Sequence, residues 1–217
     1  MPRRRNQKVL ANIKGTGDQE LDKLSWDKTM KEVEQHYCRI LKLDEWDMDK
    51  SCLTGRFPKW EQKADGKLSI RNISNWREGQ GHSAAAMRER YMPDDLTTAY
   101  NVVRILKAAT GKSTILRAYK CDWSMAFRQT PTRPDQAHLT LEATWNPHGR
   151  RAENWRSSGN CFGGKGSQYN FIRDPALLAH FGRHFLGLVV GHYSDDTWGI
   201  EPGSHLRPSL QAMDGAP

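Results

Sequence analysis

The sequence has few cysteines, no C-x-x-C pair and no long apolar run. Its four cysteines lie far apart, at Cys38, Cys52, Cys121 and Cys161. This spacing argues against a zinc module and a small disulfide scaffold, and it indicates an intracellular setting, cytoplasmic or nuclear. No apolar run approaches the about 20 residues that cross a bilayer, so no membrane partner is expected. The basic start leads into no apolar segment and does not predict a secretory signal.

Acidic side chains are outnumbered, with 33 Lys and Arg against 25 Asp and Glu, a formal net charge of +8. A basic excess of this size favours phosphate-rich or acidic partners, although it says nothing about the fold. Hydrophobic residues make up 37%, a low share that still supports a core, and the eight Trp argue against disorder. The length of 217 residues allows one domain or one and a half.

Apolar periodicity and turn residues predict helices and strands in no regular βαβ order, which indicates an α+β fold. Residues 1–18 are expected to form a loose polar terminus, and loops are expected at 44–66 and 146–166. The predicted helices span 18–43, 94–110 and 167–185, the last kinked or restarted at Pro175. The predicted strands span 67–76, 114–123, 137–145 and 186–193, and a turn at 194–197 leads to a return strand at 198–202.

Two short motifs suggest sites but lack the required context. The segment ATGKST, residues 109–114, matches only the end of a phosphate-binding P-loop, because Leu106 stands where the motif needs glycine. It also follows a helix and opens a strand, so Gly111 is interpreted as a helix C-cap. His180 and His184 lie four residues apart, but the residues between them do not form the H-E-x-x-H pattern of a zinc site.

Two adjacent acids, Asp195 and Asp196, follow the apolar run Phe185–Val190. The simplest interpretation is a hairpin turn whose acids face solvent. A third acid, Asp122, ends another hydrophobic strand. Strand-end acids side by side in a sheet would create a strong negative potential, which divalent cations relieve. The sequence therefore indicates a cation site at these strand ends.

Four segments, taken in order, resemble motifs of reverse transcriptases, and their overall pattern is similar to that of retrotransposon enzymes. KCDWSMAFRQTP, Lys120–Pro131, resembles the first catalytic motif, and HYSDD, His192–Asp196, resembles the Tyr-x-Asp-Asp box. CFGGKGSQYNFIRDPALL, Cys161–Leu178, resembles the segment that opens the helix supporting template and nucleotide. Asp65–Ala84 resembles the fingers strand. Any one match is a poor signal, but four in order are specific.

The resemblance implies a two-metal nucleotidyl transfer, in which a primer 3′-hydroxyl attacks a deoxynucleoside triphosphate. Asp122 and Asp195 would hold two Mg²⁺ ions, or Mn²⁺, with Asp196 as the auxiliary acid. The backbone carbonyl of Trp123 would complete the metal shell. The implied partners are an RNA or DNA template with its primer and deoxynucleoside triphosphates; the oligomeric state stays open.

The resemblance also implies a set of residues that bind the nucleotide. Phe127 would lie under the sugar and exclude a 2′-hydroxyl. Lys67 and Arg71 would grip the triphosphate, the arginine through its planar fork. The other implied nucleotide contacts are Trp123, Phe162, Gly163, Tyr193 and Ser194. A wider phosphate-binding track is expected along Lys67, Arg71, Arg128 and the basic segment Arg150–Arg156.

The sequence departs from the family pattern in three places. Asn75 replaces the usual Asp of the fingers motif, CFGG replaces the usual Pro-Phe-Gly or Pro-Gln-Gly, and nothing after Pro202 resembles a thumb. The implied architecture is an α+β polymerase fold with a ferredoxin-like antiparallel sheet. Its predicted regions are an N-terminal extension with one helix at 1–50, a fingers-like region at 51–110, a palm-like catalytic region at 111–202 and an irregular tail at 203–217.

Three readings compete with an active polymerase core from a retroelement polyprotein. The first is an inactive, truncated remnant that only binds nucleic acid through its basic surface. The second is a structural or interaction protein whose motif matches are accidental. The third is an RNA-templated RNA polymerase, which is disfavoured because Phe127 would obstruct a ribonucleotide.

Overall fold

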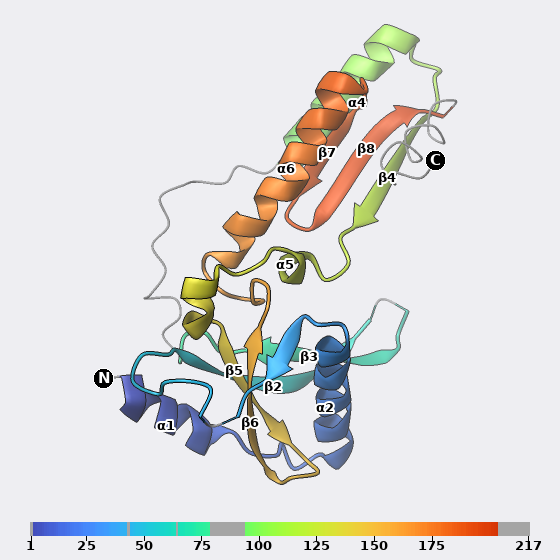
Figure 1. Ribbon diagram of the computed structural model, residues 1–217. Helices are drawn as coiled ribbons and strands as arrows, with labels where there is room; N and C mark the ends of the chain where they lie inside the picture. The colour runs from blue at the N-terminus through green and yellow to red at the C-terminus, as the bar shows by residue number, and fades with distance from the viewer. Residues whose placement is uncertain (1, 43, 64, 79–93, 204–217) are drawn as a thin grey trace. The chain divides into compact units, whose positions relative to one another are not determined.

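The computed structural model describes residues 2–42, 44–63, 65–78 and 94–203 (Figure 1). Helices and strands are mixed, so the fold is α+β, as the sequence predicts. The chain divides into two compact units. The first unit lies within Met1–Arg88 and Phe127–Asn170, and the second within Glu89–Ala126 and Phe171–Pro217. Neither unit is one continuous segment, so the division differs from the consecutive regions that the sequence suggests. Residues 79–84 of the predicted fingers segment and 204–217 of the predicted tail lie outside the described residues.

The first unit is built on a five-stranded sheet with the order β1-β6-β5-β2-β3. All neighbouring pairs are antiparallel except β2 and β5, which are parallel. The strands are β1 Cys38–Ile40, β2 Leu53–Gln62, β3 Leu68–Ser74, β5 Leu141–Asn146 and β6 Arg151–Ser157. The helices of this unit are α1 Pro2–Asn12, α2 Gln19–Glu34 and the 3-10 helix Pro134–Leu139, and α5 Ala126–Gln129 begins at its boundary.

Helices α1 and α2 pack on opposite faces of this sheet. Val9 of α1 joins the apolar core with Leu53 of β2, whereas Glu32 of α2 pairs with Arg56 of β2 at 2.6 Å. Alternate residues of a strand point to opposite faces, so Leu53 and Arg56 mark the two sides. The side that carries Arg56 holds buried charges packed against the ring of the buried Trp155, with the Arg56 guanidinium carbon 4.6 Å from the ring centroid.

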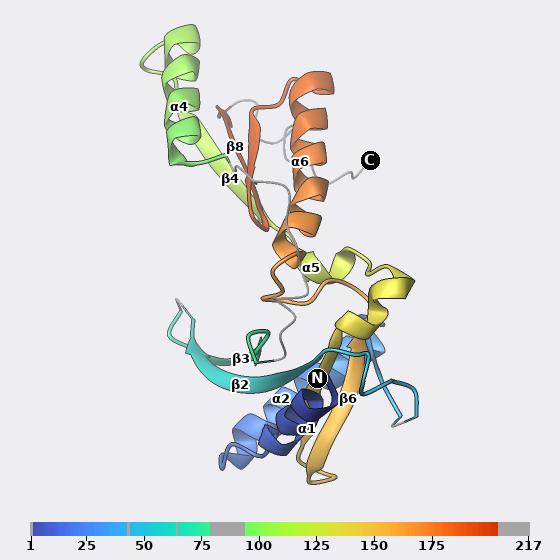
Figure 2. The same ribbon diagram turned by 90° about the vertical axis from the view of Figure 1, so that its left-hand side faces the viewer.

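The second unit is built on a three-stranded antiparallel sheet with the order β4-β8-β7. Figure 2 shows the strands of this sheet between α4 and α6. Pro175 lies inside α6 without ending it. The strands are β4 Leu116–Asp122, β7 Val190–Tyr193 and β8 Asp196–Pro202, and the helices are α4 Leu96–Thr110 and α6 Ser167–Phe185, whose first residues belong to the first unit.

Helix α4 has a cap at each end, and the cap at its C-terminus confirms the sequence interpretation of Gly111. The Asp95 side chain accepts from the backbone N–H of Thr98 at 2.9 Å, which caps the N-terminus. Gly111 has a φ of 97°, and its N–H donates to the carbonyl of Lys107 at 3.1 Å. Gly111 is therefore a C-cap glycine in the left-handed region and not part of a P-loop.

The sequence prediction differs most from the structure in four segments, and the expected turn at 194–197 is shorter because Asp196 and Thr197 belong to β8. The expected loop 44–66 contains all of β2, the expected loop 146–166 contains β6, the expected loose terminus contains α1, and the end of the expected helix 18–43 forms β1. Strands β2 and β6 escape the apolar-alternation rule because they bury polar side chains such as Arg56 and Asn154. Among the described residues, no helix is long and apolar enough to cross a membrane.

Candidate active site

Strand pairing places Asp122 at the end of β4 directly opposite Asp196, the first residue of β8. Directly opposite residues of an antiparallel pair have side chains on the same face, with Cα atoms about 4.5–5.5 Å apart. Both acids therefore lie on one face of the sheet at the same end. The predicted strand ends thus meet in space.

Asp195 lies beside this pair, in the tight turn between β7 and β8. Tyr193 pairs with Asp196, so Ser194 and Asp195 form the connection, and Ser194 has a φ of 54°. The backbone N–H of Trp123 donates to the carbonyl of Asp195 at 3.0 Å, which ties the turn to the end of β4. Two-residue hairpin turns favour positive φ, so the unusual backbone of Ser194 belongs to the tight turn.

The acids face away from α6. A β-carbon built on Gly182 of α6 would lie 3.0 Å from Val190 Cγ1, so α6 covers the face of the sheet that carries Val190. Val190 pairs with Gly199, whereas Asp196 is an odd number of residues from Gly199 and points the other way. Trp123 anchors the strand end to the covered side, because its Nε1–H donates to Thr197 Oγ1 at 3.0 Å and its ring meets Phe171 edge-on.

Lys120 shares the face of the acids. It precedes Asp122 by two residues on β4, and its Nζ lies 2.8 Å from Asp196 Oδ2. The pKa of Lys120 is raised above its usual value, first by the hydrogen bond and charge of Asp196 and then by the charges of Asp122 and Asp195. Sequence analysis missed this residue, although the period of two along a strand could have indicated it.

The resemblance implies bound Mg²⁺, and the acids provide a partial test of that fit. Among the residues that the structure describes, no group of three or more His, Cys, Asp or Glu side chains is close enough to hold a metal ion. However, all three carboxylates act electrostatically on one cation, the ammonium of Lys120. Carboxylate oxygens are the ligands that Mg²⁺ prefers. The residue types at this end of the sheet are therefore those that Mg²⁺ prefers, although they do not form a group of three ligands in the described residues.

A second group of predicted residues comes together in the first unit. The rings of Phe127 and Phe162 meet edge-on with centroids 5.1 Å apart. Trp76, which follows β3, donates its Nε1–H to the carbonyl of Phe162 at 2.8 Å. Gly163 has a φ of 78°, and a β-carbon there would lie 3.4 Å from Trp76 Cδ1. Trp76 thus holds the Phe162–Gly163 segment, and Phe162 in turn contacts Phe127. The sequence analysis assigned no role to Trp76.

The predicted phosphate contact Arg128 is wrong, because its side chain is only 1% exposed. Its guanidinium pairs with Glu32 at 3.1 Å and Glu142 at 3.4 Å, and it also donates to Ser157 Oγ. Glu142 in turn accepts from Ser74 Oγ. A buried arginine needs carboxylate partners, and these came from acids that the sequence analysis overlooked. Arg128 therefore supports the fold beneath Phe127 and cannot reach a phosphate at the surface.

Lys67 and Arg71, the predicted triphosphate contacts, remain exposed in the first unit. Their side chains are 81% and 67% exposed, and they form surface ion pairs with Asp65 at 3.6 Å and Glu61 at 3.3 Å. Such pairs are weak and break readily in favour of a phosphate. The predicted site residues thus fall into two groups. Asp122, Trp123, Tyr193, Ser194, Asp195 and Asp196 lie in the second unit, and Lys67, Arg71, Phe127, Phe162 and Gly163 lie in the first.

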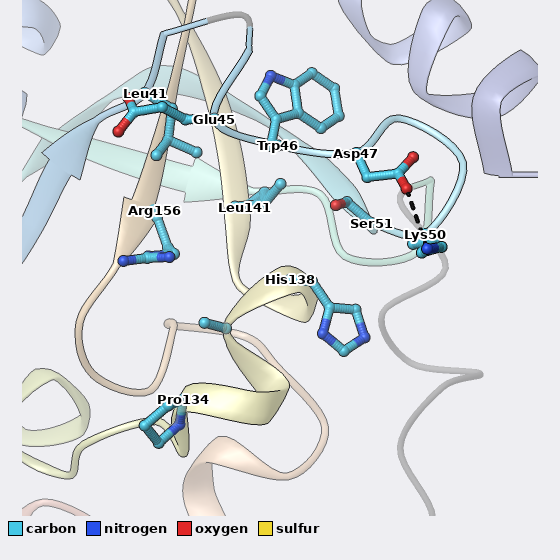
Figure 3. Close-up of a pocket in the computed structure, with 11 residues that line it drawn as sticks. Leu41, Glu45, Trp46, Asp47, Lys50, Ser51, Pro134, His138, Leu141 and Arg156 are labelled. Carbon is cyan, nitrogen blue, oxygen red and sulfur yellow. Dashed lines mark ion pairs between the residues drawn. The ribbon is translucent and has the colours of Figure 1, made fainter.

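The first unit also has a pocket of about 380 Å³ that the sequence did not predict (Figure 3). In Figure 3, His138 and Arg156 lie on either side of Leu141. The two acids of the lining are already paired, Glu45 with Arg39 at 2.7 Å and Asp47 with Lys50 at 3.7 Å. The pocket therefore offers no free carboxylate pair for acid–base chemistry.

The histidine pair on α6 shows no sign of a metal site. His180 and His184 are exposed, and their rings stack with centroids 3.9 Å apart. Nδ1 of His184 lies 3.0 Å from the carbonyl oxygen of His180. One ring nitrogen is therefore used within the helix.

The comparisons with known proteins do not assign the chain to a family. No protein-family model matches the sequence, and no curated protein matches it either. The functional argument therefore rests on the residues and their geometry.

Proposed function

We propose that the chain is a nucleotidyltransferase core of the reverse transcriptase type, in which the second unit acts as the palm and the first unit contributes fingers-like elements. The observation that carries the proposal is the pairing of Asp122 with Asp196, next to a tight turn that carries Asp195. A turn with solvated acids alone would not require a third acid across the sheet. The order of the motifs along the chain supports the same conclusion.

In this proposal, Asp122, Asp195 and Asp196 hold the divalent cations. These ions would activate the primer hydroxyl and steady the leaving pyrophosphate. Trp123 fixes the acids, because its backbone joins the hairpin turn and its indole is anchored to Thr197. Tyr193, which is 55% exposed, and Ser194 lie at the same end of the sheet and would contact the primer end and the incoming nucleotide.

The residues of the first unit would select and hold the nucleotide. Phe127 would limit space at the 2′ position of the sugar, and Phe162 holds its ring edge-on. Gly163 would allow close approach of the backbone, because its left-handed conformation favours glycine. Lys67 and Arg71 would exchange their surface carboxylates for phosphate oxygens.

Primer extension on an RNA template tests the proposal. With Mg²⁺ or Mn²⁺, Asp122→Asn and Asp195→Asn should reduce single-turnover extension by far more than the factor of about ten that corresponds to 1.4 kcal/mol. Each change removes a charged ligand and barely alters size. Asp135→Asn is the matched control, since Asp135 is exposed and pairs with Arg133 in the first unit. Equal extension by wild type and Asp195→Asn would exclude the assigned chemistry.

Phe127→Ala adds a positive signal to the same assay. The smaller side chain should leave extension with deoxynucleotides measurable and admit ribonucleotides, because it opens space without touching the acids.

The second candidate function is a remnant that only binds nucleic acid. The ion pair between Lys120 and Asp196 favours it, because that pair partly neutralises the acids without a metal. Nucleic-acid binding with no extension by any variant would support the remnant.

A further inference from the structure

Lys120 places a positive charge beside Asp196, one of the three acids at this end of the sheet. On β4 it stands opposite Trp198, two pairs along the sheet from Asp122 and Asp196. The diagonal neighbour across the two strands is Asp196, which is within reach of a long side chain. The Nζ–Oδ2 distance of 2.8 Å shows that this reach is used.

The surroundings of the ammonium keep it charged. The carboxylates of Asp196, Asp122 and Asp195 all raise the pKa of Lys120. A lysine ammonium is positively charged at neutral pH, and its contact with Asp196 therefore forms an ion pair. Its single charge offsets only one of three negative charges, so the cluster keeps a net negative charge that attracts a further cation.

We propose that Lys120 is an internal counter-ion of the acid cluster, holding Asp196 while no divalent cation is bound and competing with that cation for the same carboxylate. This inference rests on the proposed function, because it assumes that the acids take up such a cation. When the cation binds, the Nζ–Oδ2 contact breaks and the ammonium swings away on its four-carbon stem. No covalent bond changes.

The ion pair is suited to exchange because it is exposed. The side chain of Lys120 is 63% exposed and that of Asp196 is 27% exposed, so water can replace each partner as they separate. An arginine in this place could bind Asp196 through two parallel hydrogen bonds and would be harder to displace. Lysine thus holds the acid without blocking the site permanently.

Removal of the counter-ion should tighten metal binding. We expect Lys120→Met to bind Mn²⁺ roughly three- to tenfold more tightly than wild type, because a competing positive charge is lost. The measurement is the loss of the free Mn²⁺ signal in electron paramagnetic resonance during titration at constant ionic strength. Lys120→Gln serves as a second variant, and circular dichroism checks that both variants are folded.

Three comparisons separate the possible results. Lys50→Met, which removes a surface lysine paired with Asp47, should bind Mn²⁺ as wild type does, and Asp122→Asn should bind more weakly. If Asp122→Asn weakens binding while both Lys120 variants match wild type, the counter-ion role is wrong and the proposed function stands. If Asp122→Asn and both Lys120 variants all bind as wild type does, the acid cluster is not a metal site, and both the counter-ion role and the proposed chemistry are wrong.

The thermal midpoint provides a readout that does not depend on activity. Without metal, Lys120→Met should melt lower than wild type, because the carboxylates then repel one another unopposed. Saturating Mn²⁺ should raise its midpoint more than that of wild type, since a bound ion stabilises the folded state in proportion to its affinity. An equal rise in the two proteins would contradict the counter-ion role.

Discussion

Gly199 of β8 lies beneath the ring of Tyr119 on the neighbouring strand. A β-carbon at this position would be 2.2 Å from the Tyr119 ring, far closer than any real contact. Tyr119 is nearly buried, and burial, with the charge of Glu201 as a smaller cause, raises its pKa to about 12. The ring therefore stays neutral and has no room to retreat. Because Gly199 has no β-carbon, β4 and β8 can pair without interruption as far as Asp122 and Asp196.

We predict that Gly199→Ala destabilises the protein by about 1–3 kcal/mol, because the ring or the strand must shift. Urea denaturation followed by tryptophan fluorescence measures the change. Gly166→Ala is the control, since no atom lies within 4 Å of the added carbon there. A stability loss at Gly199 no larger than at Gly166 would show that the sheet yields easily at this point.

Helix α4 begins at Asp95, a carboxylate whose pKa is lowered by its capping hydrogen bond. The hydrogen bond from the Thr98 N–H lowers the pKa of Asp95 below the usual 3.8. A carboxyl group with a lowered pKa in the folded state stabilises that state above its unfolded pKa, and this stabilisation is lost as the pH falls through the folded pKa. The contribution of the cap is therefore complete at neutral pH and disappears in acid.

Asp95→Ala should accordingly lower the thermal midpoint at pH 7, and the difference from wild type should shrink once the pH falls below 3.8. Melting curves between pH 7 and pH 2.5 test this. Asp95→Asn is the matched control, because asparagine caps helices about as well as aspartate and does not titrate in this range. A difference that stays constant down to pH 2.5 would mean that the carboxylate charge plays no part.

Elements with one apolar face could be predicted from the sequence, whereas elements that bury charge could not. Helix α6 and strand β4 follow the expected periods, and the strand ends that carry the acids meet as expected. The register sets Asp122 opposite Asp196, however, and not opposite Asp195, which the resemblance paired with it. The sequence of β6 is typical of a polar loop, because its buried polar residues depend on partners that lie far away in the chain. One such partner is Arg128, which donates a hydrogen bond to the buried Ser157. The same distance explains why Arg128 was mistaken for a surface contact and why Lys120 and Trp76 were overlooked.

Over the whole molecule, the positive charge is partly neutralised inside. Arg56 and Arg128 belong to the buried network with Glu32 and Glu142, so they add nothing to the surface field. Lys67 and Arg71, in contrast, keep most of their side-chain surface in solvent. The chain as a whole still carries a net +8. Its attraction for polyanions must therefore come from exposed side chains, and it should depend on salt.

We predict that the affinity for single-stranded RNA falls linearly with salt on a double logarithmic plot, with a slope of about −0.7 for each phosphate neutralised. The double variant Lys67→Gln, Arg71→Gln should flatten this slope by about 1.4 units, because two phosphate contacts are lost. Fluorescence anisotropy at several salt concentrations provides the measurement. Arg133→Gln, which removes an exposed arginine outside the proposed track, is the control. Salt-independent affinity would contradict both nucleic-acid functions.

The order of the strands in the first sheet has a consequence for folding during translation. Cys38 of β1 pairs with Ser157 of β6, 119 residues further along the chain. The segments 89–126 of the second unit are translated in between. Until β5 and β6 emerge, β1 has no neighbour and the parallel partner of β2 does not exist. Helices α1 and α2 can pack on β2 soon after synthesis, but the surface of α2 that contacts β5 stays uncovered until that strand emerges. Such late, long-range pairing favours slow folding and exposes apolar surface in the nascent chain.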